Sequence, residues 1–259
     1  MAGDGVGRSG VEILADTNAL ADAAAELFAD SAERAIAASG RFVVALSGGS
    51  TPRRAYERLA RAPFATRIPW TAVHVIWGDE RCVAPTDADS NYRMAFEALL
   101  AHVPLPPSNV HRMHGEDDPT RAAASYETEL RTLLHTPAGS PSTEPGQRID
   151  LALLGLGDNG HTASIFPESD ATRETVRWAM AESVDASPSY RITLTAPLLN
   201  AAAEVLFLVS GKTKTEMLTR VLDGPRRPGE LPAQLIAPTN GRLRWLVDVA
   251  AAARLQRSS

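Results

Sequence analysis

The sequence predicts an α/β protein built on a mainly parallel sheet with helices on both faces. The main observation is that short apolar segments alternate with longer helical segments through most of the 259 residues. Polar loops, several of them rich in glycine, directly follow some of these apolar segments. The composition, 44% hydrophobic and 22% charged, is that of a soluble chain able to bury a substantial core.

Strands are predicted where short runs are rich in Val, Ile, Leu and other apolar residues. These runs lie at residues 11–14, 42–46, 73–77, 151–154, 178–182, 191–194, 205–209 and 244–247. Helices are predicted at residues 17–39, 52–61, 91–102, 120–134 and 214–222. Gly40 ends the first of these helices, and Pro52 occupies a favoured first position in the second. This order of elements predicts a Rossmann-like three-layer architecture.

Residues 11–259 are expected to form a single domain that follows a flexible N-terminus of residues 1–10. Segment 135–147 is rich in Pro, Gly, Ser and Thr and is predicted to be a surface loop. It does not resemble a domain linker, because the strand pattern resumes at Leu151. Segment 223–232 is a second predicted loop, since prolines interrupt any regular element there.

Charge and apolar patterning exclude several classes of partner. The net charge of −5, with basic residues dispersed along the chain, predicts no nucleic-acid partner. No stretch approaches the ~18 consecutive apolar residues of a membrane span. Residues 1–10 also lack the apolar core of a secretory signal, so no membrane partner is expected. The single cysteine, Cys82, allows no intrachain disulfide, which fits a cytoplasmic location.

Four polar loops, at residues 47–51, 79–81, 158–161 and 210–214, directly follow predicted strands. If those strands are parallel, all four loops emerge at the carboxyl edge of the sheet. Open α/β sheets bind their ligands at that edge. The sequence therefore predicts a ligand site there.

The loop Ser47-Gly48-Gly49-Ser50-Thr51 has the features of a phosphate cradle. Its glycines let the backbone turn with N–H groups outward, and the helix that follows offers an anion its free N–H groups and positive dipole end. The loop matches neither the P-loop nor the dinucleotide fingerprint. A plain turn in which Ser50 or Thr51 caps the helix is an equally good interpretation.

The loop at residues 155–161 carries His161 among three glycines, and Thr162 is expected to cap a short helix after it. A titratable imidazole on such a turn at a strand end is a candidate for proton transfer. Gly157 and Asp158 lie in the same loop. The alternative is a tight turn with an exposed histidine.

The charged group Asp79-Glu80-Arg81 follows the strand at 73–77. Arg81 could bind carboxylate or phosphate oxygens while an acid of this group holds it, or the three residues could form a solvated turn. Asn91 is expected to cap the next helix, and the alternative is that it touches a ligand.

Lys214 and Arg191 could each reach an anion in the same cleft or could be ordinary surface charges. The histidines, carboxylates and single cysteine show no metal-ligand spacing, so neither a metal nor a cofactor is expected.

Together these motifs resemble the 6-phosphogluconolactonase family, which is related to glucosamine-6-phosphate deaminase. The similar segments are Leu46-Ser-Gly-Gly-Ser-Thr-Pro52, Trp77-Gly-Asp-Glu-Arg81 with Ser90-Asn91, Gly155-Leu-Gly-Asp-Asn-Gly-His-Thr-Ala-Ser-Ile-Phe-Pro167, Arg191-Ile-Thr-Leu-Thr195 and Ser210-Gly-Lys-Thr-Lys214. The family commonly has an acid just before the Gly-His pair, and here that residue is Asn159.

The resemblance implies hydrolysis of 6-phospho-D-glucono-1,5-lactone in the oxidative pentose phosphate pathway. In that reaction a neutral His161 would take a proton from water, and the imidazolium would protonate the departing ring oxygen. Asp79 and Arg81 complete the expected catalytic set. Loop 47–51, Asn91, Gly157, Asp158, Arg191 and Lys214 are the expected binding residues for the phosphorylated lactone.

Two alternatives are a deaminase- or isomerase-like enzyme with Asp79 as base and a non-catalytic regulator that binds sugar phosphates. A monomer or small homo-oligomer is expected in each case.

Overall fold

The computed structural model describes residues 10–136, 141–184 and 190–256. Its main feature is a six-stranded sheet in the order β1-β9-β8-β5-β2-β3, in which all neighbours are parallel. These strands are β1 (Val11–Leu14), β2 (Phe42–Leu46), β3 (Val73–Trp77), β5 (Leu151–Leu154), β8 (Glu204–Val209) and β9 (Arg242–Asp248). The predicted α/β class and its mainly parallel sheet are confirmed.

A second, antiparallel sheet has the strand order β4-β7-β6. It comprises β4 (Asp79–Arg81), β6 (Ala179–Ser183) and β7 (Tyr190–Leu194). The prediction of a loop at 79–81 is therefore wrong, because three consecutive charged residues show none of the apolar character by which strands are recognised. The small sheet is tied to the large one, since the Leu194 N–H donates to the carbonyl of Gly78 directly after β3.

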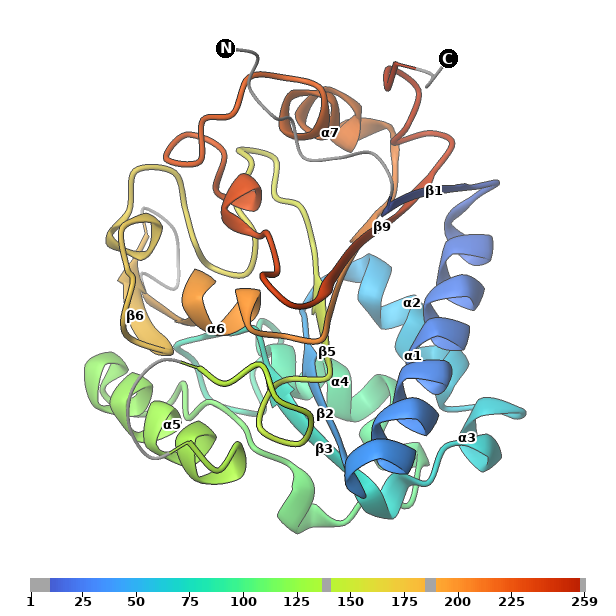
Figure 1. Ribbon diagram of the computed structural model, residues 1–259, viewed down its shortest axis with the longest axis vertical. Coiled ribbons are helices and arrows are strands. Elements are labelled where there is room, and N and C mark those ends of the chain that lie inside the picture. Colours follow the sequence, from blue (N-terminus) through green and yellow to red (C-terminus); the bar gives the residue numbers. More distant parts are fainter. Residues whose placement is uncertain (1–9, 137–140, 185–189, 257–259) are drawn as a thin grey trace.

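Helices cover both faces of the large sheet, and Figure 1 shows α1 and α2 on one side of it and α5 and α6 on the other. The α-helices are α1 (Thr17–Ser39), α2 (Ser50–Leu59), α3 (Phe64–Arg67), α4 (Asn91–Ala98), α5 (Pro119–Leu133), α6 (Ala196–Asn200) and α7 (Thr215–Leu222). The helix predicted at 91–102 ends early, because only a 3₁₀ turn, Leu100–His102, follows α4. The short helices α3 and α6 were not predicted.

Alternate residues of the central strands pack into opposite cores. In β2, Phe42 and Val44 face the core shared with α1, α2 and α4, whereas Val43 and Ala45 face the core shared with α5 and α7. All five residues of β2 are buried. A parallel strand covered on both faces is expected to be apolar throughout, which explains why these segments were recognisable in the sequence.

Other predictions were wrong or lie outside the described residues. No helix follows Thr162, whose hydroxyl donates to the carbonyl of Gly155 at 2.9 Å and so ties two parts of its own loop. Residues 1–9 of the expected flexible N-terminus and residues 137–140 of the expected surface loop are not described.

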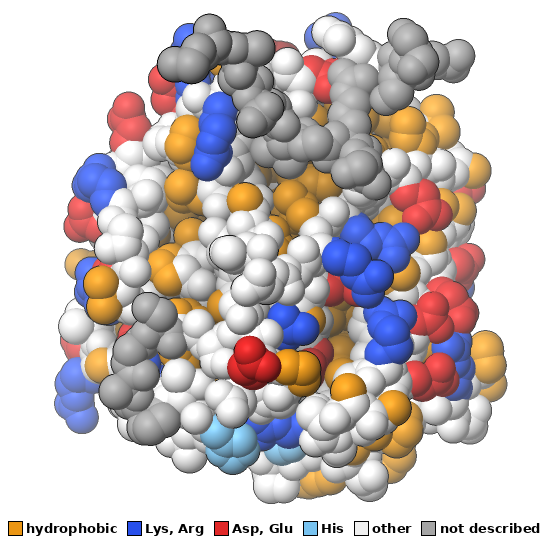
Figure 2. Space-filling view, viewed as in Figure 1, with side chains coloured by type: hydrophobic (Ala, Val, Ile, Leu, Met, Phe, Trp, Pro, Cys, Tyr) orange, Lys and Arg blue, Asp and Glu red, His pale blue; other side chains and the backbone are white. Residues whose placement is uncertain are grey.

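The amino edge of the sheet holds a charged cluster around Glu204, the first residue of β8. This carboxylate is 3% exposed and lies 3.3 Å from Arg34, 3.4 Å from Arg242 and 3.6 Å from Arg244. In Figure 2, basic side chains gather over β9 and the neighbouring helix α1. The glycine-rich loops lie at the opposite, carboxyl edge.

Candidate active site

A pocket of about 320 Å³ lies where the loops at the carboxyl edge meet. It is lined by Ser47, Gly48, Gly49, Asp79, Arg81, Asn91, Gly155, Leu156, Gly157, Asp158, His161, Ala163 and Lys214. The structure thus brings together most of the residues selected from the sequence. Ser50, Thr51 and Arg191 do not line it, although Arg191 lies directly opposite Arg81 in the small sheet.

The loop after β2 presents backbone and a buried hydroxyl to this pocket. Tyr56 fixes the loop, because its Oη accepts from the Ser47 N–H and donates to the Ser47 carbonyl, both at 2.9 Å. Gly49 has a φ of 103° and is the N-cap of α2, and no side chain caps this helix. The alternative with Ser50 or Thr51 as cap is therefore wrong. Within the described chain, the buried Ser47 Oγ makes no hydrogen bond.

Asn91 was expected to cap α4, but it lines the pocket instead. The cap is Ser90, whose Oγ accepts from the Arg93 N–H at 3.1 Å. The Asn91 amide donates to the carbonyl of Asp79 at 2.9 Å and to its carboxylate at 3.3 Å. Gly48 is required beside it, since a Cβ at residue 48 would lie 1.9 Å from Asn91 Oδ1.

Glu80 stabilises the start of α4 and does not hold the Arg81 guanidinium. Its carboxylate, 3% exposed, accepts from the backbone N–H groups of Asn91 and Tyr92, both at 2.7 Å, and from Ser90 Oγ at 3.0 Å. Burial raises the pKa of Glu80, and these hydrogen bonds oppose the rise. The Arg81 guanidinium donates to the carbonyl of Asp89 at 2.6 Å.

Arg81 and Arg191 form a pair of like charges across β4 and β7. Burial lowers the pKa of Arg191, and the neighbouring Arg81 lowers it further. Like charges opposite one another destabilise a sheet. A bound anion beside this pair would relieve that repulsion.

The ring of His161 is held by its own loop. Its Nδ1 lies 2.6 Å from Asn159 Oδ1, and its backbone N–H donates to the same oxygen at 3.2 Å. Phe166 packs against the ring, with centroids 4.6 Å apart. A Cβ at residue 157 would lie 2.0 Å from His161 Nδ1, so only Gly157 leaves room for the ring.

The electrostatic surroundings favour a neutral His161. Burial lowers the pKa of His161, and the cations Lys214 and Arg191 act in the same direction, whereas Asp79 and Asp158 oppose them. A neutral imidazole at neutral pH can accept a proton.

Asp158 and Lys214 form an ion pair at the open side of the pocket. The Asp158 side chain is 82% exposed, and its hydrogen bond to Lys214 lowers the pKa of its carboxyl. Because such an exposed pair contributes little stability, Lys214 can exchange this carboxylate for a ligand anion at small cost.

Asp79 is buried and fixed by two further side chains. Its Oδ2 accepts from Ser164 Oγ at 2.7 Å, and its other oxygen faces Asn91. Ser164 is placed by its backbone N–H, which donates to Thr193 Oγ1. Ser164 and Asn159 were not selected from the sequence, although both lie in the segment around His161.

The comparisons with known proteins agree with this geometry. The family described as glucosamine-6-phosphate isomerases/6-phosphogluconolactonase matches residues 15–245. The chain belongs to this family. It is 40% identical over 246 residues to a 6-phosphogluconolactonase of Nostoc sp., covering 95% of this chain and 98% of that protein.

Solved structures are similar over almost the whole chain. A 6-phosphogluconolactonase from Trypanosoma cruzi has a TM-score of 0.83 and 26% identity, covering 96% of this chain and 97% of its own. A 6-phosphogluconolactonase from Thermotoga maritima has a TM-score of 0.76 and 31% identity, covering 92% and 98%.

Several other groups can be placed. Among the described residues, no group of three or more His, Cys, Asp or Glu side chains could hold a metal ion, and no helix is long and apolar enough to cross a membrane. Burial raises the pKa of Cys82 to about 11, so its thiol stays protonated and is a poor nucleophile.

Proposed function

We propose that this protein hydrolyses 6-phospho-D-glucono-1,5-lactone to 6-phospho-D-gluconate, the second step of the oxidative pentose phosphate pathway. The observation that carries the proposal is a half-buried imidazole in a pocket between a glycine-rich helix start and cationic side chains. Membership of the family and 40% identity to a protein named 6-phosphogluconolactonase support the same substrate.

The first chemical step needs a base for the attacking water. Nδ1 of His161 is bound to Asn159, so Nε2 is the nitrogen that takes the proton while the water oxygen bonds to the lactone carbonyl carbon. Backbone N–H groups of the glycine loops, or Arg81, stabilise the developing oxyanion. The imidazolium then gives its proton to the ring oxygen as the C–O bond breaks. Positioned acid–base catalysis of this kind contributes about 10²–10⁴-fold.

The phosphate does not react, and its binding orients the lactone. The start of α2, Ser47 Oγ and Lys214 offer one set of donors, and Arg81 with Arg191 offers a second. Two cationic sets suit a substrate that carries phosphate at one end and develops negative charge at the other.

The test is an assay of purified protein on freshly generated lactone, corrected for spontaneous hydrolysis, with glucosamine 6-phosphate assayed in parallel for ammonia release. We expect rapid lactone hydrolysis and no ammonia. Ammonia release without lactone hydrolysis would establish the deaminase alternative, and binding of the product without turnover of either compound would establish a regulator.

We further propose a cytoplasmic enzyme that acts as a monomer or small homo-oligomer. Residues 11–259 are proposed to act as one domain, because β1 pairs with β9 from the other end of the chain. Size-exclusion chromatography with light scattering tests the oligomeric state.

A further inference from the structure

We propose that Asn159 is the positioning residue for His161, and that this chain separates the orientation of the ring from the neutralisation of its charge. Asn159 provides the first function and Asp79 the second. The inference rests on the proposed lactonase reaction and extends it to a side chain that differs from the acid common at this place in the resembled family.

The hydrogen bonds fix both the side-chain orientation of Asn159 and the tautomer of His161. The backbone N–H of His161 can only donate, so the Asn159 atom 3.2 Å away is the amide oxygen. That oxygen can only accept, so the ring nitrogen 2.6 Å away, Nδ1, must carry a proton. Nε2 is then the unprotonated nitrogen, as a general base requires.

The turn leaves little freedom for another arrangement. Gly160 has a φ of 85°, and its N–H donates to the carbonyl of Gly157 at 3.1 Å. The Gly157 N–H in turn donates to the carbonyl of His161 at 2.8 Å. Asn159 and His161 are thus held on a closed turn in which the amide and the ring face each other.

An amide orients the ring but adds no negative charge beside it. The charged groups that act on His161 are Asp79, Asp158, Lys214 and Arg191. Asp158 is paired with Lys214 on the exposed side, so these two charges largely cancel. Asp79 is the fixed carboxylate that remains, buried and held by Ser164 and Asn91. Asp79 lines the same pocket as His161 and opposes the cation Arg191, so it is the carboxylate placed to stabilise the imidazolium formed during proton transfer.

The first variant is Asn159→Leu, which removes the acceptor at similar side-chain size. We expect kcat to fall about 10²-fold with little change in KM, because a misplaced or wrongly protonated base affects the chemical step rather than binding. Combined with His161→Ala, the same substitution should cause no further loss, since its effect acts through the ring.

The second variant is Asn159→Asp, which keeps the acceptor and adds a charge. We expect activity to be retained and the acidic limb of kcat/KM against pH to move to higher pH, because a second carboxylate favours the imidazolium. Asn18→Asp adds the same charge at the exposed start of α1 and should leave the limb unmoved. Asp79→Asn should move the limb to lower pH and reduce kcat, and Asn159→Asp should reverse that shift in the double variant.

The outcomes separate this inference from the proposed function. If the wild-type protein does not hydrolyse the lactone, or if His161→Ala keeps full activity, the proposed function itself fails. If His161 is required but Asn159→Leu keeps wild-type kcat, or if Asn159→Asp leaves the pH profile unchanged, only the role of Asn159 is overturned. Because Asn-Gly sequences can deamidate to Asp, peptide mass mapping must show intact Asn159 in the wild-type sample.

Discussion

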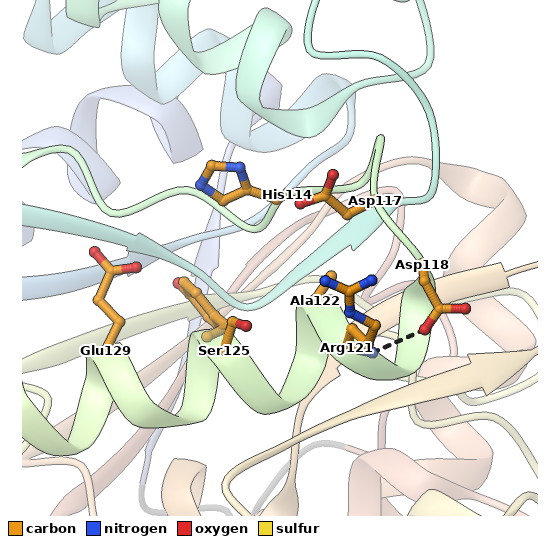
Figure 3. A pocket seen from close by; sticks show the side chains of 8 residues that line it. His114, Asp117, Asp118, Arg121, Ala122, Ser125 and Glu129 are labelled. Carbon is orange, nitrogen blue, oxygen red and sulfur yellow. Dashed lines mark hydrogen bonds between the residues drawn. The ribbon is translucent and has the colours of Figure 1, made fainter.

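Two pockets of similar volume contain histidine, carboxylates and arginine, yet only one has the arrangement of a catalytic site. The pocket at the carboxyl edge measures about 320 Å³ and the other, beside α5, about 310 Å³. In the second, Glu129, Ser125 and Arg121 rise from α5 toward the segment that carries His114 and Asp117 (Figure 3). Residue types alone therefore do not distinguish the two.

The difference lies in how the charged groups are paired. Around the α5 pocket, His114 lies 3.6 Å from Glu116, which also pairs with Arg112, and His111 lies 2.7 Å from Glu129. At the carboxyl edge, His161 is hydrogen-bonded to an uncharged amide, and burial lowers the pKa of the ring. His161 leaves Nε2 available to act as a base, whereas both ring nitrogens of His111 are engaged, by Glu129 and by His74, and the His114 side chain is 53% exposed.

The largest expected effect is the loss of the imidazole itself. His161→Ala should reduce lactone hydrolysis by about 10²–10⁴-fold, because positioned proton transfer is lost. The matched variant in the other pocket, His114→Ala, should retain wild-type kcat and KM. Steady-state assays with a thermal unfolding check decide the comparison. Equal losses in the two variants would remove the distinction drawn between the pockets.

A smaller loss is expected when the ring is kept but moved. Gly157→Ala places a Cβ about 2.0 Å from His161 Nδ1, so the ring must shift. A displacement of this kind costs up to about 10²-fold in kcat. Gly229→Ala is the control, since a Cβ there meets nothing within 4 Å. If Gly157→Ala has wild-type kcat, the fixed position of the ring is not needed for the reaction.

Much of this architecture could be predicted because the central strands are buried on both faces. Segments such as 42–46 and 151–154 are continuous apolar runs, and parallel order then places their following loops at one edge. The residues that could not be predicted depend on contacts between distant segments. β4 is recognisable as a strand only once β7 lies beside it, and Ser164 matters only because Asp79 lies 2.7 Å away.

The role of Asn159 was hidden for a different reason. The sequence shows an amide two residues before His161 but not that the turn directs its oxygen to the ring. The same limit applied to Glu80, one of the two acids expected to be able to hold Arg81, which instead stabilises the start of α4. Local sequence identifies the chemical groups, whereas backbone geometry selects their partners.

A third effect concerns binding rather than chemistry. Lys214→Ala should raise KM for the phosphorylated lactone by about 10-fold or more, the typical value of one charge-assisted hydrogen bond, with a smaller change in kcat. The KM for the unphosphorylated lactone should not change in this variant. Arg112→Ala, which removes a cation from the side of the α5 pocket, is the matched control. An unchanged KM in Lys214→Ala would exclude this lysine from phosphate binding.

The smallest expected effect is on stability and lies on the α5 side of the molecule. His74 Nδ1 is 3.1 Å from His111 Nε2, and the two rings stack with centroids 5.4 Å apart. Burial, the neighbouring His111 and Arg41 lower the pKa of His74 to about 4. Between about pH 6.5 and pH 4 the unfolded chain therefore binds a proton that the folded protein does not, so stability must fall as the pH falls through this window.

His74→Gln removes that titration. After allowance for the partly exposed ring, the free energy of unfolding should fall between pH 7 and pH 5 by about 1 kcal/mol less in the variant than in the wild-type protein. Asp150, whose pKa burial raises to about 6, acts in the opposite direction but is present in both proteins and cancels in the difference. Urea unfolding of both proteins at pH 7 and at pH 5 measures this difference in the free energy of unfolding. At pH 7 kcat should be unchanged, because His74 does not line the pocket that contains His161.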